Sequence, residues 1–272
     1  MEMVARHLAP SRERARSAIA SGQVSVAGAP ATKANRLVAP AEPIFLAGPG
    51  PRFVSRGGDK LDAALARFGL DVGGRRCLDA GASTGGFTDC LLQSGAASVV
   101  ALDVGRGQLH ERLRRDHRVI SVERTNLRLA HLADLAGEPF EVVVADLSFI
   151  SLRSVAPVLL GELAAPGADV VVLVKPQFEV GSLEGGRAEV SRGRGVVRDP
   201  RLWLGTLEGA VGAFAGCGAA MMGVMASPLT GAQGNVEFLL HCRAHSTGPF
   251  LLDLSRAVAA GLALRDAPSR EE

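Results

Sequence analysis

Residues 79–89 read DAGASTGGFTD, and a short apolar run ends where they begin. This order predicts a strand, a glycine-rich turn and the start of a helix. Glycine lets the backbone approach a ligand closely, and the first turn of a helix presents free N–H groups. A second apolar run ends at Asp103, whose carboxylate can accept hydrogen bonds from ribose hydroxyls. This stretch therefore predicts a nucleotide-binding pocket in an α/β domain.

The spacing within the turn separates two cofactor classes. A dinucleotide-binding turn has the pattern Gly-x-Gly-x-x-Gly. Here Gly81, Ser83 and Gly85 stand at alternate positions, and Asp79 precedes the first of them by two residues. This pattern is similar to the acidic glycine loop of S-adenosylmethionine (SAM) methyltransferases, with Ser83 in place of the middle glycine. The loop favours SAM and leaves an NAD site, or a βα turn without a ligand, as alternatives.

Composition limits the remaining classes. The chain has 272 residues, 47% of them hydrophobic, which is enough for one large or two unequal domains. Its formal charge is only +2, yet residues 1–50 carry six basic side chains against three acidic ones. The four cysteines form no Cys-x-x-Cys pair, and no signal peptide pattern is visible. We therefore expect a cytoplasmic protein with reduced cysteines and no metal site, the cysteines being Cys77, Cys90, Cys217 and Cys242.

One uncharged stretch, residues 209–236, is long enough to span a bilayer. Five glycines between 209 and 223 dilute it, and Ser227-Pro228 interrupts it. A helix end, a buried strand over 220–226 and a loop explain the stretch better, so we expect no membrane span.

A proline- and glycine-rich stretch, residues 40–51, divides the chain into two folding units. In the first, Ser11 is the expected N-cap of a short helix, and the period-two pattern of residues 22–28 predicts a turn and a strand. We expect a small α+β domain, a linker, an α/β domain, and a C-terminal helix with its tail, at residues 1–50, 51–58, 59–250 and 251–272.

The larger domain alternates between helical and strand patterns. A helix is predicted over 60–68, and strands over 75–79, 98–103, 119–122, 141–146, 169–175, 220–226 and 236–242. Continuous apolar runs indicate a sheet that is covered on both faces. The last two strands are joined by a segment too short for a crossover helix, so we expect them to be antiparallel. Seven strands with an antiparallel edge form the Rossmann-like sheet of SAM methyltransferases.

The segment 181–199 is rich in glycine and arginine and lacks periodicity. It follows the fifth strand, where active-site loops gather. We expect either a mobile loop that faces substrate or a solvated surface loop.

Four charged residues stand where predicted elements approach the pocket: Lys60, Asp146, Lys175 and Glu237. Asp146 and Lys175 end buried strands, where charge is costly unless it is paired. Two bases and two acids sum to zero, so we expect the four to form one cluster. Without the glycine loop, a purely structural network of ion pairs would be the preferred interpretation.

These residues resemble the Lys-Asp-Lys-Glu tetrad of ribose 2′-O-methyltransferases. Four longer motifs resemble the TlyA family: LDAGASTGGFT at 78–88, VADLSFIS at 144–151, VKPQFEVG at 174–181 and SPLTGAQGNVE at 227–237. That family comprises bacterial rRNA cytidine 2′-O-methyltransferases, also known as haemolysins. It joins an FtsJ-like methyltransferase domain to an N-terminal RNA-binding domain resembling that of a small-subunit ribosomal protein, and residues 11–33 are similar to that domain's signature.

The resemblance implies a SAM-dependent enzyme that methylates cytidine in 16S rRNA, 23S rRNA or both, with ribosomal subunits as partners. Lys60, Asp146, Lys175 and Glu237 are the implied catalytic residues, and Lys175 positions or deprotonates the ribose 2′-hydroxyl. We expect cofactor contacts from Asp79, Gly81, Ala82, Ser83, Gly85, Phe87 and Asp103. For RNA we expect contacts, chiefly to phosphate, from Arg12, Arg14, Lys33, Arg56, Arg124 and Arg128.

Two departures from the family pattern lie near the N terminus. The first domain begins several residues later than in the family, so its first helix is expected to be short or the true start to lie upstream. Phe53 stands where the family usually has tryptophan. Three alternatives to the methyltransferase remain: an RNA-binding assembly factor without catalysis, a membrane-lytic protein and an NAD enzyme.

Overall fold

The computed structural model describes residues 2–6, 8–9, 11–20, 22–47, 51–135, 137–246, 248 and 252–267. Contacts divide the chain into two compact units, Met1–Val54 with Ala267–Glu272, and Ser55–Asp266. Residues 48–50, which belong to the predicted boundary stretch, lie outside the described residues.

The described residues of the smaller unit form two helices and a three-stranded antiparallel sheet: α1 (Glu2–Ala5), α2 (Arg12–Ala20), β1 (Val24–Val26), β2 (Ala29–Pro30) and β3 (Ile44–Leu46). Ser11 caps α2 as predicted, since its Oγ accepts a hydrogen bond from the Arg14 backbone N–H at 3.2 Å. The predicted strand is short because Ala27 and Gly28 take positive φ angles of 50° and 83° and turn the chain into β2. Helix α1 precedes the predicted helix and was not expected from the pattern.

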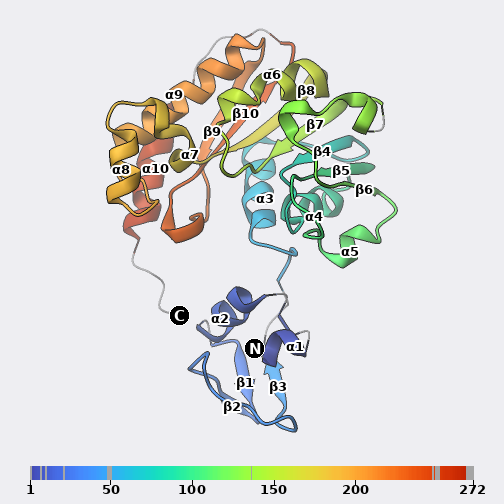
Figure 1. Ribbon diagram of the computed structural model, residues 1–272, viewed down its shortest axis with the longest axis vertical. Helices are drawn as coiled ribbons and strands as arrows, with labels where there is room; N and C mark the ends of the chain where they lie inside the picture. The colour runs from blue at the N-terminus through green and yellow to red at the C-terminus, as the bar shows by residue number, and fades with distance from the viewer. Residues whose placement is uncertain are drawn as a thin grey trace. The chain divides into compact units, whose positions relative to one another are not determined.

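In the part that the structure describes, the larger unit contains seven strands: β4 (Arg76–Ala80), β5 (Ser98–Leu102), β6 (Val119–Val122), β7 (Phe140–Ala145), β8 (Ala164–Val174), β9 (Ala220–Ala226) and β10 (Phe238–Arg243). They form one sheet in the order β6-β5-β4-β7-β8-β10-β9 (Figure 1). The first five of these strands, β4 to β8, pair in parallel, and β10 runs antiparallel to both of its neighbours. The predicted Rossmann-like sheet is confirmed, together with the antiparallel pairing of its last two strands.

The position of the antiparallel strand differs from the expectation. Strand β10 inserts between β8 and β9, so β9 forms the outer edge of the sheet. The loop between β9 and β10 is short enough to force antiparallel pairing, but local pattern does not say on which side of β9 the returning strand lies.

The helices of the larger unit are α3 (Gly57–Phe68), α4 (Gly86–Gln93), α5 (Glu111–Arg114), α6 (Ala156–Val158), α7 (Pro176–Glu179), α8 (Gly186–Arg192), α9 (Pro200–Gly216) and α10 (Leu254–Asp266). The expectation of an aperiodic loop over 181–199 is wrong in part, because this segment contains α8. A helix of seven residues between two glycines is too short for its periodicity to be recognised.

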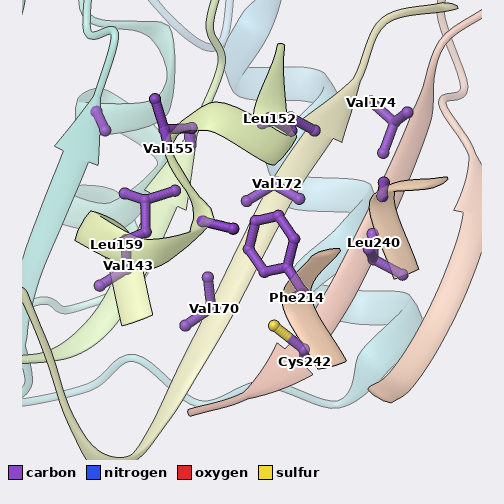
Figure 2. Packing of buried hydrophobic residues seen from close by; sticks show 14 of the residues in the cluster. Val143, Leu152, Val155, Leu159, Val170, Val172, Val174, Phe214, Leu240 and Cys242 are labelled. Atoms are coloured by element: carbon purple, nitrogen blue, oxygen red, sulfur yellow. The ribbon is translucent and has the colours of Figure 1, made fainter. Parts of the chain in front are cut away.

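Helices cover both faces of the sheet. On one face, Phe214 of α9 lies among Val170 and Val172 of β8 and Cys242 of β10 (Figure 2). On the other face, the ring of Phe68 from α3 lies 5.3 Å from the ring of His241. Because neighbouring residues of a strand point to opposite faces, Cys242 and His241 pack against different helices. The continuous apolar strands therefore have the two-sided cover that their composition predicted.

The uncharged stretch 209–236 is divided between the end of α9, strand β9 and the loop that follows, as predicted. Across the described parts of the chain, no helix is both long enough and apolar enough to cross a bilayer.

Candidate active site

The site residues gather where the parallel strands end. The carboxyl ends of parallel strands lie together, so Asp103 after β5, Asp146 after β7 and Lys175 after β8 reach the same end of the sheet. Strand β10 runs the other way, and its first residue, Phe238, pairs with Val174. Glu237, the residue before Phe238, therefore leaves the sheet beside Lys175.

Two ion pairs occupy this end of the sheet. Lys175 Nζ lies 2.5 Å from Asp146 Oδ1 and also donates a hydrogen bond to Ser148 Oγ at 3.0 Å. Lys60 Nζ donates to Glu237 Oε2 at 2.5 Å. The two lysines are similarly covered, 10% exposed for Lys60 and 11% for Lys175, whereas the carboxylates differ, 3% for Glu237 and 23% for Asp146. We call Lys60–Glu237 the inner pair and Lys175–Asp146 the outer pair.

Lys60 comes from α3, which packs against the start of α4. A side chain at Gly86 would lie 2.2 Å from Ser55 Oγ and 2.9 Å from the Gly58 backbone nitrogen, so only glycine permits this approach. The adjoining Gly57 packs on the ring of Phe87. The second half of the glycine loop therefore positions α3, which carries Lys60.

The first half of the loop borders a pocket lined by Ala82, Ser83, Ala101, Asp103, Gly105, Gln108, Leu109, Ser121 and Glu123. Asp103 shapes it by accepting hydrogen bonds from the backbone N–H groups of Ser83 at 2.8 Å and Gly105 at 2.6 Å. Ser83 takes the positive φ of 47° that the loop requires, and its hydroxyl donates to Gln108 at 3.1 Å. A carboxylate and several polar groups around an open cleft fit the ribose of a nucleoside ligand.

Gly81 and Gly85 both shape the loop. Both have positive φ angles, 86° and 95°. A Cβ at Gly81 would lie 2.6 Å from the backbone oxygen of Asp146, and one at Gly85 would lie 2.3 Å from Leu113. Gly81 thus lets the loop pass against the strand end that carries Asp146.

Asp79 is fully buried at the end of β4, below the loop. Its Oδ2 accepts hydrogen bonds from the backbone N–H of Thr88 at 2.8 Å and from the Thr88 hydroxyl at 2.6 Å, and its Oδ1 has no partner among the described residues. Burial raises the pKa of Asp79 to about 7, and the carboxylates of Asp146 and Asp103 add to the rise against the two hydrogen bonds. Asp79 therefore lies beneath the glycine loop and is bonded through one oxygen to Thr88 of α4.

The structure therefore brings the four predicted catalytic residues together as two ion pairs. Of the predicted cofactor residues, Ala82, Ser83 and Asp103 line the pocket. The other four are outside its lining: Gly81 and Gly85 belong to the loop, Asp79 lies beneath it, and the buried Phe87 packs against α3.

The predicted RNA-binding arginines and lysine lie in three places. Arg56 is exposed just before α3, and its guanidinium donates to the backbone oxygen of Thr230 at 2.8 Å. Arg124 and Arg128 are exposed after β6, where the backbone N–H of Arg124 donates to Gly105 at the pocket. The others, Arg12, Arg14 and Lys33, belong to the smaller unit.

Several residues of the site were not predicted. Gln108 and Glu123 line the pocket, and Ser148 touches Lys175. Glu123 could have been found, because it follows the third strand as Asp103 follows the second. Gln108 carries no such signal, since a long-range hydrogen bond brings it to Ser83. Within the described residues, no three His, Cys, Asp or Glu side chains are placed to hold a metal ion.

The chain matches the FtsJ-like methyltransferase family over residues 53–244. The 16S/23S rRNA (cytidine-2′-O)-methyltransferase TlyA of Mycobacterium tuberculosis is 48% identical over 243 residues, which cover 89% of this chain and 88% of the relative. Hemolysin A of Brachyspira hyodysenteriae is 40% identical over 231 residues, or 85% of this chain and 93% of the relative. The solved structure of a hemolysin-named protein of Streptococcus thermophilus aligns with a TM-score of 0.78 and 37% identity, over 94% of this chain and 92% of that one.

Proposed function

Because this chain belongs to the FtsJ-like methyltransferases, and to the TlyA family within them, we propose that it is a SAM-dependent ribose 2′-O-methyltransferase that modifies cytidine in ribosomal RNA. The substrate is 16S rRNA, 23S rRNA or both, within ribosomal subunits, and the enzyme acts in the cytoplasm where those subunits are found. Exposed basic residues of both units supply the contacts to RNA phosphates.

Two lysine–carboxylate pairs at the same strand ends as a pocket lined by Asp103 give this proposal its main support. The chain has 30 basic residues, of which only Lys33, Lys60 and Lys175 are lysines. Arginine cannot lose its proton in a protein, whereas lysine can. Two of the three lysines thus lie at the one site where a general base is needed.

When bound, SAM supplies an electrophilic methyl group. The ribose 2′-hydroxyl is a poor nucleophile and must give up its proton as the new bond forms. Lys175, in the outer pair, is placed to take that proton, and Asp146 orients its amine. Lys60 and Glu237 form the inner pair. Holding the acceptor oxygen in line with the methyl group supplies much of the remaining rate.

Substitution of Lys175 tests this function. Purified protein is incubated with tritiated SAM and with ribosomal subunits from cells that lack the gene, and Lys175→Ala is expected to lower turnover at least about 100-fold. Lys175→Arg keeps a cation but cannot act as a base, so it is expected to be equally inactive. Calorimetry is expected to show SAM binding nearly unchanged in both variants.

Arg201→Ala serves as the control, because Arg201 is exposed and pairs with Asp199 at the start of α9. It is expected to keep full turnover. Substantial methyl transfer by Lys175→Ala would remove Lys175 from the mechanism. An unaltered protein that binds SAM but transfers no methyl to either subunit would instead favour an RNA-binding assembly factor.

A further inference from the structure

Two short segments of the active site are tied to each other at three points. One is the loop 146–152 after β7. The other is the segment 175–179, which follows β8 and contains α7. At one end, Lys175 contacts Asp146 and Ser148. In the middle, the rings of Phe149 and Phe178 lie 5.0 Å apart.

Glu179 makes the third tie, at the end farthest from the lysine. Its carboxylate accepts hydrogen bonds from the Ser151 hydroxyl and from the backbone N–H of Leu152, both at 2.6 Å. Arg153 Nε lies 4.0 Å from the same carboxylate. Glu179 is buried, and a buried carboxylate that accepts two short hydrogen bonds holds its partners firmly.

The loop between these ties is held in an unfavourable backbone conformation. Phe149 has a φ of 62°, in the left-handed region that bulky residues rarely adopt, although its side chain is 90% exposed. Such a conformation persists only where surrounding contacts determine it. The contacts on either side of Phe149 are those of Ser148 with Lys175 and of Ser151 and Leu152 with Glu179. The strained turn therefore joins the Glu179 tie to the Ser148 tie.

We propose that Glu179 is a positioning residue for methyl transfer: by fixing the loop 146–152 it places the Ser148 hydroxyl as the second acceptor of the Lys175 amine. This role rests on the proposed function and adds two residues to it. Neither residue touches the reacting atoms, since both act through Lys175.

The chemistry follows from the groups on the Lys175 nitrogen. Lys175 must first release a proton, and its neutral amine then has two N–H donors and one lone pair. With Ser148 Oγ and the paired Asp146 carboxylate taking the two N–H groups, the lone pair is left for the ribose hydroxyl. The ribose oxygen then bonds to the methyl carbon while the carbon–sulfur electron pair stays on sulfur. The hydroxyl proton moves to the lone pair, and Lys175 becomes an ammonium group with three donors.

Ser148→Ala tests the acceptor. Removal of one hydrogen bond is expected to lower kcat about three- to tenfold. The KM for ribosomal subunits and the calorimetric dissociation constant for SAM are expected to stay unchanged, because only the orientation of the amine is affected. Ser148→Thr keeps the hydroxyl and is expected to restore most of kcat. A merely structural serine would not show this separation of kcat from KM or this rescue.

A double-mutant cycle tests whether Glu179 acts through Ser148. Glu179→Gln keeps the size of the side chain but loses one of the two acceptors, and it is expected to lower kcat by a factor similar to that of Ser148→Ala. The double variant is then expected to be no slower than Glu179→Gln alone. Glu184→Gln, at an exposed acid beyond the tie, is the matched control and is expected to keep full kcat.

The outcomes separate this role from the proposed function. If the unaltered protein methylates ribosomal subunits and Ser148→Ala is equally fast, the role of Ser148 is wrong while the function stands. If the effects of Glu179→Gln and Ser148→Ala multiply in the double variant, Glu179 does not act through Ser148. If the unaltered protein transfers no methyl group, the proposed function fails and the positioning role fails with it.

Discussion

At the scale of single residues, the two lysine–carboxylate pairs have different physical roles. Glu237 of the inner pair is 3% exposed and Asp146 of the outer pair 23%, whereas the two lysines are similarly covered. Removal of Glu237 takes away the acceptor that holds the buried Lys60 ammonium, whereas Lys175 keeps Ser148 as an acceptor when Asp146 is changed. The inner pair should therefore matter to stability and the outer pair to chemistry.

Glu237→Ala is expected to destabilise the protein by about 3–5 kcal/mol, because it leaves the ammonium of Lys60 buried without a partner. Asp146→Asn, at the outer pair, is expected to cost less, because the amide oxygen remains an acceptor and Lys175 keeps its hydrogen bond to Ser148. Urea denaturation followed by circular dichroism measures both. Equal losses of unfolding free energy in the two variants would contradict the distinction between the pairs.

Asp79 makes a contribution to stability that depends on pH. Its pKa of about 7 lies above the ordinary value of 3.8, so the folded state binds a proton that the unfolded state has released between these two values. This contribution is fully present below about pH 4, falls as the pH rises to about 7 and is constant above that. Asp79→Asn keeps an acceptor for Thr88 and does not titrate.

The difference in unfolding free energy between Asp79→Asn and the unaltered protein is therefore expected to grow in favour of the variant from about pH 4 to about pH 7 and to change little above that range. Chemical denaturation at a series of pH values measures it. A difference that stays constant with pH would show that Asp79 titrates near its ordinary pKa when the protein is folded.

At the scale of secondary-structure elements, the contact between α3 and α4 positions the inner lysine. It depends on Gly86, where a methyl group would collide with Ser55 and with the Gly58 backbone. The glycine loop thus has two functions in one motif: its first half shapes the pocket, and its end admits a neighbouring helix.

Gly86→Ala is expected to destabilise the protein by about 1–3 kcal/mol, since the added methyl group overpacks a close contact. It should also lower turnover by displacing Lys60. Gly212→Ala, on the open side of α9 where no atom lies within 4 Å, is the matched control and should stabilise by about 0.5–1 kcal/mol. Thermal unfolding together with the methyl-transfer assay checks both variants.

The strands and helices also show how much of this fold can be predicted from the sequence. Buried strands have apolar runs that are visible locally, so all seven were found, and two of them with the observed bounds. The place of β10 inside the sheet and the helix within 181–199 were missed, because each depends on contacts between distant residues. Asn235, for example, binds the backbone of Gly195 and Val197 across about forty residues of chain.

The site shows the same division. Lys60, Asp146, Lys175 and Glu237 could be predicted because a family motif marks them. Ser148 and Glu179 lie in the quoted motifs, yet their roles depend on hydrogen bonds between two loops that no spacing reveals. Phe87 was assigned to the cofactor from its place in the glycine loop, but its ring lies between two helices.

At the scale of the whole molecule, the first fifty residues, most of the smaller unit, carry more net positive charge than the entire chain. Such a unit suits binding to RNA phosphates, which releases counterions and makes affinity depend on salt. Changing Arg12, Arg14 and Lys33 together to alanine is expected to weaken binding to ribosomal subunits. The slope of log affinity against log salt concentration should fall by about 1 for each phosphate group that the variant no longer binds.

Filter binding over a range of KCl concentrations measures that slope. Arg201 lies in the larger unit and pairs with Asp199, so Arg201→Ala is the control and should leave the slope unchanged. A triple variant with the slope of the unaltered protein would show that the smaller unit makes no phosphate contacts with the subunits.

In the proposed reaction, methyl transfer requires a lysine at position 175, beside Asp146, and the acceptor is a ribose in ribosomal RNA. The most direct measurement maps 2′-O-methyl marks on rRNA from cells that lack the gene and carry either the unaltered protein or Lys175→Arg. We expect a methylated cytidine with the unaltered protein and none with the variant. The same mark with Lys175→Arg, or no mark with either protein, would contradict the account.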